Sequence, residues 1–243
     1  MIFNNKPPKL LDCRAQGAQS GAELFLVEGD SAANAVANLR NAQFQAVLPM
    51  QGKPMNAYKY SQKKVQQNPL FNALYQCLAS PQNIPAKAGY SYAKASIGAG
   101  CDASFNITPF NIKQCRYQRI VLLMDADADG IHCGALMLLF FHRYMPALLV
   151  EGRVEMARAP VGEVTNNITK TTQYAYTDAQ FMALLKAESL QANQSPQSLK
   201  YRGLAGIAAN TLAKLCIDPQ TRKTSVMGMQ DAVMALEIFG GIE

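Results

Sequence analysis

The sequence has few of the residues from which transition-metal sites are built. It holds two histidines and six cysteines in 243 residues, and no two cysteines form a Cys-x-x-Cys pair. Structural zinc sites need thiolates or imidazoles at such close spacing, so the pattern excludes a zinc finger or ribbon. The chain is also far longer than a disulfide-stapled miniprotein. We therefore expect reduced thiols in a cytoplasmic protein.

Long apolar runs and nucleotide-binding loops are absent as well. The most apolar run, CGALMLLFF at 133–141, is too short to span a bilayer and precedes His142 and Arg143, which favours a buried helix. The first residues, MIFNNKPPKLLDC, do not have a basic start followed by an apolar stretch, so the sequence does not predict a signal peptide. The sequence QGKPM at 51–55 lacks the following Ser or Thr and the earlier glycine of a P-loop. We expect no ATP site and no membrane association.

What the chain does have is an apolar core and a basic surface. Hydrophobic residues make up 49% of the sequence, which is enough to bury a sizeable core. The formal net charge is +6 and the isoelectric point about 9.0. A basic balance of this kind is compatible with a polyanionic partner, above all nucleic acid.

Apolar segments alternate with helical ones along the first two thirds of the chain. Buried strands are predicted at 23–27, 44–49, 119–125 and 153–160. Helices are predicted at 31–40 with Asp30 or Ser31 as cap, around 63–78, and from Gly130 to near Gly152. This order implies an α/β layer with a parallel sheet. Residues 162–200 are predicted to be a mostly polar segment outside this layer, with a helix near 178–190. One or two further helices are predicted after it.

Two of the predicted core strands end in acidic residues. The first is followed by Glu28 and Asp30, and the third by Asp125, Asp127 and Asp129. Carboxyl ends of strands line the ligand crevice of open α/β sheets, so these side chains converge if the strands are neighbours. Clustered carboxylates repel one another unless a cation lies among them. An oxygen-rich pocket of this kind suits Mg²⁺, with Mn²⁺ as a second candidate.

The acidic motif has other interpretations. DADADG also matches the first half of an EF-hand loop, but the twelfth position falls on Leu136, where a bidentate Glu is required. A solvated acidic surface loop would explain the aspartates but not Glu28. His132 and Cys133 are adjacent and could ligate a metal, although we favour a structural or supporting role for His132. His142 is interpreted as a helix-surface residue.

Taken together, these motifs resemble a Toprim domain, and more specifically the Toprim region of the B subunit of bacterial type IIA topoisomerases. ELFLVEGDSA resembles the glutamate motif of that family, FQAVLPMQGKPMNA its second block, and IVLLMDADADGIH its DxDxDG block. CRYQRI resembles the lead-in to that last block, and KYRGLAG with CIDPQTRK resembles the close of the B subunit. The likeness extends over about residues 8–239 and does not include the ATPase region of the family.

The resemblance implies roles for particular residues. Glu28, Asp125 and Asp127 would hold the metal and carry catalysis, with Asp129 as an accessory ligand. Lys53 would contact DNA phosphate or the scissile region. In this family the attacking tyrosine lies on the A subunit. The implied partners are therefore DNA, a type IIA topoisomerase A subunit and a separate ATPase subunit. The chain is then a component that is not active alone.

The resemblance also implies a fold and its boundaries. We expect a Rossmann-like α/β Toprim domain with a parallel central sheet flanked by helices, plus a small helical tail region. The predicted division is a lead-in at 1–22, the Toprim domain at 23–160 with a polar insertion at about 57–95, and a C-terminal tail region at 161–243.

Several positions depart from the family pattern. ANAVANLR replaces a segment with two glycines and a lysine, Gln51 stands where the family has a basic residue, and GLAGI replaces Gly-Leu-Gly-Glu-Met. After RAP the chain has Val161, Gly162 and Glu163 where the family has Pro-Leu-Tyr. Three functions therefore remain open. The first is a Mg²⁺-binding topoisomerase component, the second a non-catalytic module that binds DNA or a topoisomerase, and the third a Toprim nuclease.

Overall fold

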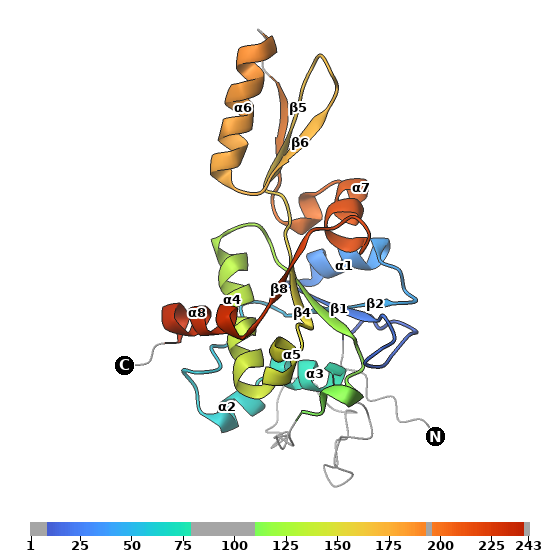
Figure 1. Cartoon of the computed structure of the whole chain (residues 1–243), viewed down its shortest axis with the longest axis vertical. Helices are drawn as coiled ribbons and strands as arrows, with labels where there is room; N and C mark the ends of the chain where they lie inside the picture. The colour runs from blue at the N-terminus through green and yellow to red at the C-terminus, as the bar shows by residue number, and fades with distance from the viewer. Residues whose placement is uncertain (1–8, 79–109, 193–195, 241–243) are drawn as a thin grey trace.

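The computed structural model describes residues 9–78, 110–192 and 196–240. Part of the predicted insertion at 57–95, from residue 79 to 95, and Cys101 lie outside these ranges. Figure 1 shows a main α/β body and a smaller lobe formed by β5, β6 and α6 that stands clear of it. Within the described ranges no helix is both long and apolar enough to cross a membrane.

A five-stranded sheet forms the centre of the main body. Its strands in spatial order are β2 (Gln45–Pro49), β1 (Glu23–Val27), β3 (Arg119–Leu123), β4 (Val154–Ala157) and β8 (Thr224–Met227). The first four are mutually parallel, and β8 pairs with β4 in the antiparallel direction. β1 and β2 are buried at every position, which explains the apolar residues that follow Glu23 and Gln45 in these strands. The predicted parallel α/β fold is confirmed.

Helices cover both faces of this sheet. One face carries α2 (Gln62–Gln66), α3 (Pro69–Leu78), α4 (Ala128–Tyr144), α5 (Pro146–Val150) and α8 (Met229–Phe239). The other face carries α1 (Asp30–Leu39), η4 (Leu204–Gly206), α7 (Ala209–Leu212) and the π-helical turn η5 (Ala213–Ile217). A short 3₁₀ turn, η3 (Ile112–Gln114), precedes β3.

Alternate residues of each strand point into one of two cores. Leu24 and Leu26 of β1 pack with Phe71 of α3 and Phe140 of α4, whose rings stack at 4.1 Å between centroids. Phe25 of β1 points the other way, toward α1, α7 and η5. Both cores are apolar, so the sheet is fixed from both sides and its ends are left to position polar groups.

Three helix predictions differ from the structure in detail. The helix expected at 63–78 is two helices, because Pro69 lacks the N–H that a continuous helix needs and instead begins α3. The long helix expected to end near Gly152 breaks at Met145 for the same reason, before Pro146. α1 has Gly29 as its N-cap and no side-chain cap, so the expected cap from Asp30 or Ser31 is wrong.

The region after β4 contains more strand than its sequence indicates. The small lobe, residues 161–192 and 196–200, is a three-stranded antiparallel sheet packed on α6 (Asp178–Ala192). Its strands in spatial order are β6 (Thr172–Ala175), β5 (Gly162–Thr165) and β7 (Gln197–Lys200). The chain then returns to the main body through η4, and β8 closes the main sheet beside β4.

Candidate metal-binding site

The acidic site lies at the carboxyl ends of β1 and β3. The two strands are parallel neighbours with Leu26 opposite Leu122, so the residues after them emerge at the same edge of the sheet. The backbone N–H of Asp125 donates a hydrogen bond to Oε1 of Glu28 at 3.0 Å. The structure therefore brings together the two acidic motifs, which lie 97 residues apart in the chain.

The first turn of α4 holds the second and third aspartates. Asp127 is the N-cap of α4, and its Oδ1 accepts a hydrogen bond from the N–H of Gly130 at 2.8 Å. Asp129 lies in the first helical turn, where Lys53 forms an ion pair with its Oδ1 at 2.8 Å. Both side chains of this pair are exposed, so its contribution to stability is small.

Gly130 allows the helix to begin this close to the strand ends. A Cβ at this position would lie 2.1 Å from the backbone oxygen of Asp125 and 2.8 Å from Oε1 of Glu28. No side chain can be accommodated at those distances without moving the backbone. The glycine of the DADADG motif is thus explained by the close approach of α4 to β1 and β3.

The electrostatics of the site agree with a crowded acidic cluster. Burial raises the pKa of Glu28, and the negative charges of Asp125, Asp127 and Asp129 raise it further. The hydrogen bond from the Asp125 N–H opposes this rise. The pKa of Asp129 is lowered, first by its hydrogen bond with Lys53 and then by the charge of that lysine. The cluster thus has unrelieved like-charge repulsion centred on Glu28.

The donor set has the chemistry of a Mg²⁺ site, although it is not assembled as one. Among the described residues no three Asp, Glu, His or Cys side chains surround a common point. Within those residues the hydrogen bonds of Glu28 and Asp127 use Oε1 and Oδ1, which leaves the second oxygen of each for a cation. Hard carboxylate oxygens are the ligands that Mg²⁺ prefers, and it fills its remaining positions with water. The residue types therefore fit Mg²⁺, and their side chains would have to move toward one another to bind it.

Basic residues border the acidic cluster. Lys53 follows the turn after β2, where Gln51 and Gly52 both have positive φ angles of 63° and 107°. Lys53 also lines a cavity of about 580 Å³ that it shares with Lys59 and His132. Lys53 thus places a cation beside the carboxylate of Asp129, and Lys59 lines the cavity next to it.

A further cation, which the sequence did not indicate, lies next to Gln51. Lys9 Nζ donates to Oε1 of Gln51 and to Oδ2 of Asp30, both at 2.7 Å, and Gln51 Nε2 donates to Oδ1 of Asp30 at 2.8 Å. The three side chains form a closed ring. A positive charge is thereby present beside the position at which the sequence has lost one.

Three residues that could have served as alternative ligands have other surroundings. The ring of His132 stacks on Phe239 with centroids 4.8 Å apart, in keeping with a structural role. Burial raises the pKa of the Cys133 thiol to about 11, and the negative charge of Glu28 adds to this, so the thiol is protonated at neutral pH. His142 accepts or donates a hydrogen bond with the Tyr58 hydroxyl at 2.5 Å.

A sequence model of the Toprim domain matches residues 23–159, more than half of the chain. The chain belongs to the Toprim domain family. The matched residues contain β1 to β4 and every side chain of the acidic cluster described above.

Curated relatives of this Toprim chain are B subunits of DNA gyrase. The protein from Spiroplasma citri is 33% identical over 229 residues, which are 94% of this chain and 31% of the relative. The protein from Halalkalibacterium halodurans is 34% identical, with 96% of this chain and 32% of the relative covered. The protein from Thermus thermophilus is 31% identical, with 96% and 33% covered. The chain thus spans about a third of the length of these relatives and resembles their Toprim region.

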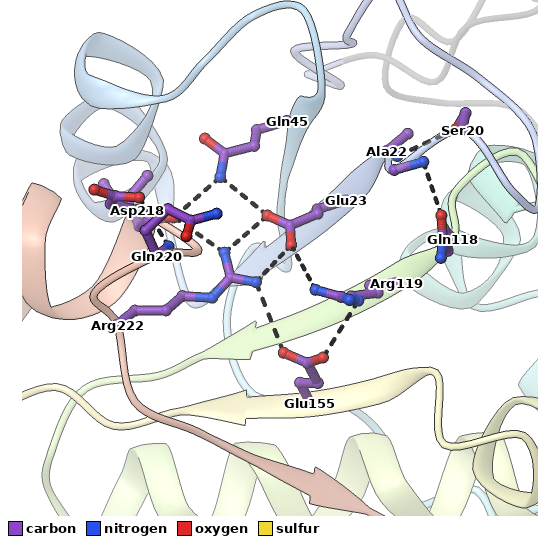
Figure 2. Close-up of polar contacts among 12 residues, drawn as sticks. Ser20, Ala22, Glu23, Gln45, Gln118, Arg119, Glu155, Asp218, Gln220 and Arg222 are labelled. Carbon is purple, nitrogen blue, oxygen red and sulfur yellow. Dashed lines mark hydrogen bonds and ion pairs between the residues drawn. The ribbon is translucent and has the colours of Figure 1, made fainter.

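The opposite end of the Toprim sheet carries a polar network that sequence patterns did not predict. Figure 2 shows Arg222, from the segment before β8, between the carboxylates of Glu23 and Glu155, with Arg119 in contact with both acids. Gln45 Nε2 also donates to Glu23, at 3.0 Å. A cavity of about 630 Å³ adjoins Glu23. The acids here are buried and paired with arginines, whereas at the carboxyl ends the exposed Asp30 and Asp129 are paired with lysines.

Proposed function

We propose that this chain is the Mg²⁺-binding Toprim component of a type II DNA topoisomerase, and that it supports DNA cleavage and religation together with an A subunit. The observation that carries the proposal is the convergence of Glu28 and Asp125 at the ends of adjacent strands, with Asp127 capping the following helix. The likeness to B subunits of DNA gyrase supports the same conclusion.

In the proposed reaction the residues of this chain hold and orient the reacting groups. Glu28, Asp125 and Asp127 would bind the metal, with Asp129 as an accessory ligand. A bound Mg²⁺ supplies charge neutralisation at the phosphate and stabilises the attacking and leaving oxygens. Lys53 would exchange its weak ion pair with Asp129 for a DNA phosphate oxygen. Such an exchange costs little, because both partners of the pair are already exposed to water.

The attacking group has to come from a partner protein in this proposal. Tyr117, the tyrosine nearest to the aspartates in sequence, is completely buried before the start of β3, at the far end from the acidic cluster. Its hydroxyl donates to Oδ1 of Asp12 at 2.7 Å. A hydroxyl in that position cannot reach a substrate held by Glu28. Tyr117 therefore does not supply the attacking group, which agrees with a tyrosine carried by the partner.

A second candidate function is a non-catalytic module that binds DNA or a topoisomerase. It is favoured by the ion pair between Lys53 and Asp129, and by the absence of a ready three-ligand cluster among the described residues. The departures at Gln51 and in GLAGI point the same way. The intact carboxylates favour the first function, because a structural role alone gives no reason to keep their repulsion.

A plasmid cleavage assay separates these functions. The chain is mixed with a cognate A subunit of gyrase, supercoiled plasmid and Mg²⁺, and cleaved DNA is trapped with detergent. We expect cleavage with the wild type and with Glu237→Ala, an exposed carboxylate on α8, and none with Glu28→Ala. We expect no cleavage or relaxation by the chain alone. Association without cleavage would favour the non-catalytic module, and cleavage by the chain alone would identify a Toprim nuclease.

A further inference from the structure

We propose that the turn formed by Gly203 and Leu204 is a positioning element of the acidic site: it fixes the carboxylate of Asp125 and thereby sets the affinity of the site for a divalent cation. The inference rests on the proposed function, because it assumes that Asp125 is a metal ligand. It assigns a role to the KYRGLAG segment, which lies outside the residues matched by the Toprim model.

The first contact is a hydrogen bond from the backbone. The N–H of Leu204 donates to Oδ1 of Asp125 at 2.8 Å, across 79 residues of chain. A backbone donor cannot rotate away as a side chain can, so it holds one carboxylate oxygen in a defined direction. Outer residues of this kind orient metal ligands and tune their affinity without touching the metal.

The second contact is the close approach of Gly203 to the same carboxylate. Gly203 has φ 69° and ψ 175°, a conformation that is essentially restricted to glycine. A Cβ at this position would lie 2.8 Å from Oδ2 of Asp125 and 3.3 Å from its Cγ and Oδ1. The glycine is therefore required both by the backbone and by the space that Asp125 occupies. Leu204 holds Oδ1 of Asp125 and Gly203 lies against Oδ2, so the two residues together restrict the orientation of the carboxylate.

The turn is itself held firmly. The side chain of Leu204 is 1% exposed and belongs to the core between β1 and α1. Gly206 donates its N–H to the Gly203 oxygen at 3.1 Å. Tyr201, just before the turn, donates its N–H to Val161 O at 2.9 Å and its hydroxyl to Glu163 in β5 at 2.5 Å. The turn thus connects the small lobe to Asp125.

A cavity of about 480 Å³ lies between the acidic loop and this turn. Its lining includes Asp125, Asp127, Tyr201 and Arg202. Beside this cavity, the hydrogen bond from Leu204 to Asp125 connects the turn to the acidic residues. Since the turn favours one arrangement of Asp125, cation binding and the order of the turn are linked, and each must affect the other by the same free energy.

The test is a Mn²⁺ titration of the whole chain, in which the electron paramagnetic resonance signal of free Mn²⁺ reports binding. Gly203→Ala adds a methyl group against Asp125. Gly206→Ala, in the same motif, is the matched control, because its Cβ would meet no atom within 4 Å. We expect Gly203→Ala to weaken Mn²⁺ binding about 10- to 100-fold and Gly206→Ala to leave it unchanged. Tyr201→Phe, which loses the bond to Glu163, should weaken it at least about twofold.

The outcomes separate this inference from the proposed function. If the wild type binds no Mn²⁺, the metal site itself is wrong and the inference fails with it. If the wild type binds and Gly203→Ala binds equally well, only the inference is overturned. Circular dichroism shows whether Gly203→Ala is folded. If it is not, hydrogen exchange of the wild type decides: Mg²⁺ should slow exchange at 201–206 and not in α8, and unchanged exchange at 201–206 would overturn the inference.

Discussion

The guanidinium group of Arg222 donates two hydrogen bonds to the carboxylate of Glu23, at 2.8 and 2.5 Å, although the residues lie 199 positions apart. Both side chains are almost completely buried, with 3% and 4% of their surface exposed. The pair joins the segment before the last strand to the first strand. It fixes the segment before β8 onto the main sheet, as Figure 2 shows, at the start of β1 and therefore at the opposite end of that strand from Glu28.

Loss of this pair should destabilise the fold. Arg222→Met leaves Glu23 buried without its bidentate partner, so we expect the free energy of unfolding to fall by about 3–5 kcal/mol. Lys200→Met is the matched control, because it removes an ion pair with Asp178 whose side chains are both exposed, and should cost no more than about 1 kcal/mol. Urea denaturation at neutral pH measures both. Equal losses would contradict the structural role of Arg222.

Asp12 should make stability depend on pH in the acid range. Burial alone would raise its pKa, but the hydrogen bond from Tyr117 and the charge and hydrogen bond of Arg116 outweigh burial and lower the pKa below the ordinary value of 3.8. A lowered folded pKa means that its contribution is present above 3.8 and is lost as the pH falls below that value.

Asp12→Asn isolates this contribution. We expect the variant to be less stable than the wild type by about 1–3 kcal/mol at neutral pH, because a charged acceptor is lost. The difference should shrink as the pH falls below 3.8, where the wild-type carboxylate also becomes neutral. Denaturation curves from neutral pH down into the acid range would show it. A gap that stays constant with pH would contradict the lowered pKa.

The strands were predictable because they carry their own signal. β1 and β2 are buried at every position, so each reads as a short apolar run, and the proximity of Glu28 to Asp125 followed once their strands were assumed to be neighbours. The strands of the small lobe have no such signal, since β7 is exposed along its whole length. Its pairing with β5 is set by tertiary context.

Sequence patterns also could not predict the contacts that support the site. The hydrogen bond from Leu204 to Asp125 uses a backbone donor, which any residue type except proline supplies. Only the glycine at 203 gave a hint, because glycine is favoured where φ is positive. Arg222 is of a residue type that is mostly exposed, and nothing in its local sequence predicts its burial or its pairing with Glu23.

Metal binding should depend on the charge of two aspartates. Asp125→Asn and Asp127→Asn each remove a negative charge and a hard ligand, so we expect Mg²⁺ binding to weaken at least about tenfold. Asn caps a helix as well as Asp does, so Asp127→Asn should leave α4 and the overall stability intact. Glu237→Gln, an exposed carboxylate on α8, is the control. Isothermal titration calorimetry decides, and equal binding by all four proteins would refute the site.

DNA binding should be weak, independent of sequence and steeply dependent on salt. The net charge of +6 provides the cations, and each phosphate contact releases counterions, with a slope of about −0.9 in log–log form. Lys53→Ala should lower the slope by about this amount, because Lys53 borders the acidic site and can exchange Asp129 for a phosphate. Lys186→Ala, on an exposed position of α6, should leave the slope unchanged.

Fluorescence anisotropy with a labelled duplex over a salt series measures all three proteins. Binding that does not change with salt would show that phosphate contacts do not carry it. An equal loss in Lys186→Ala would show that the acidic site is not where this chain meets DNA.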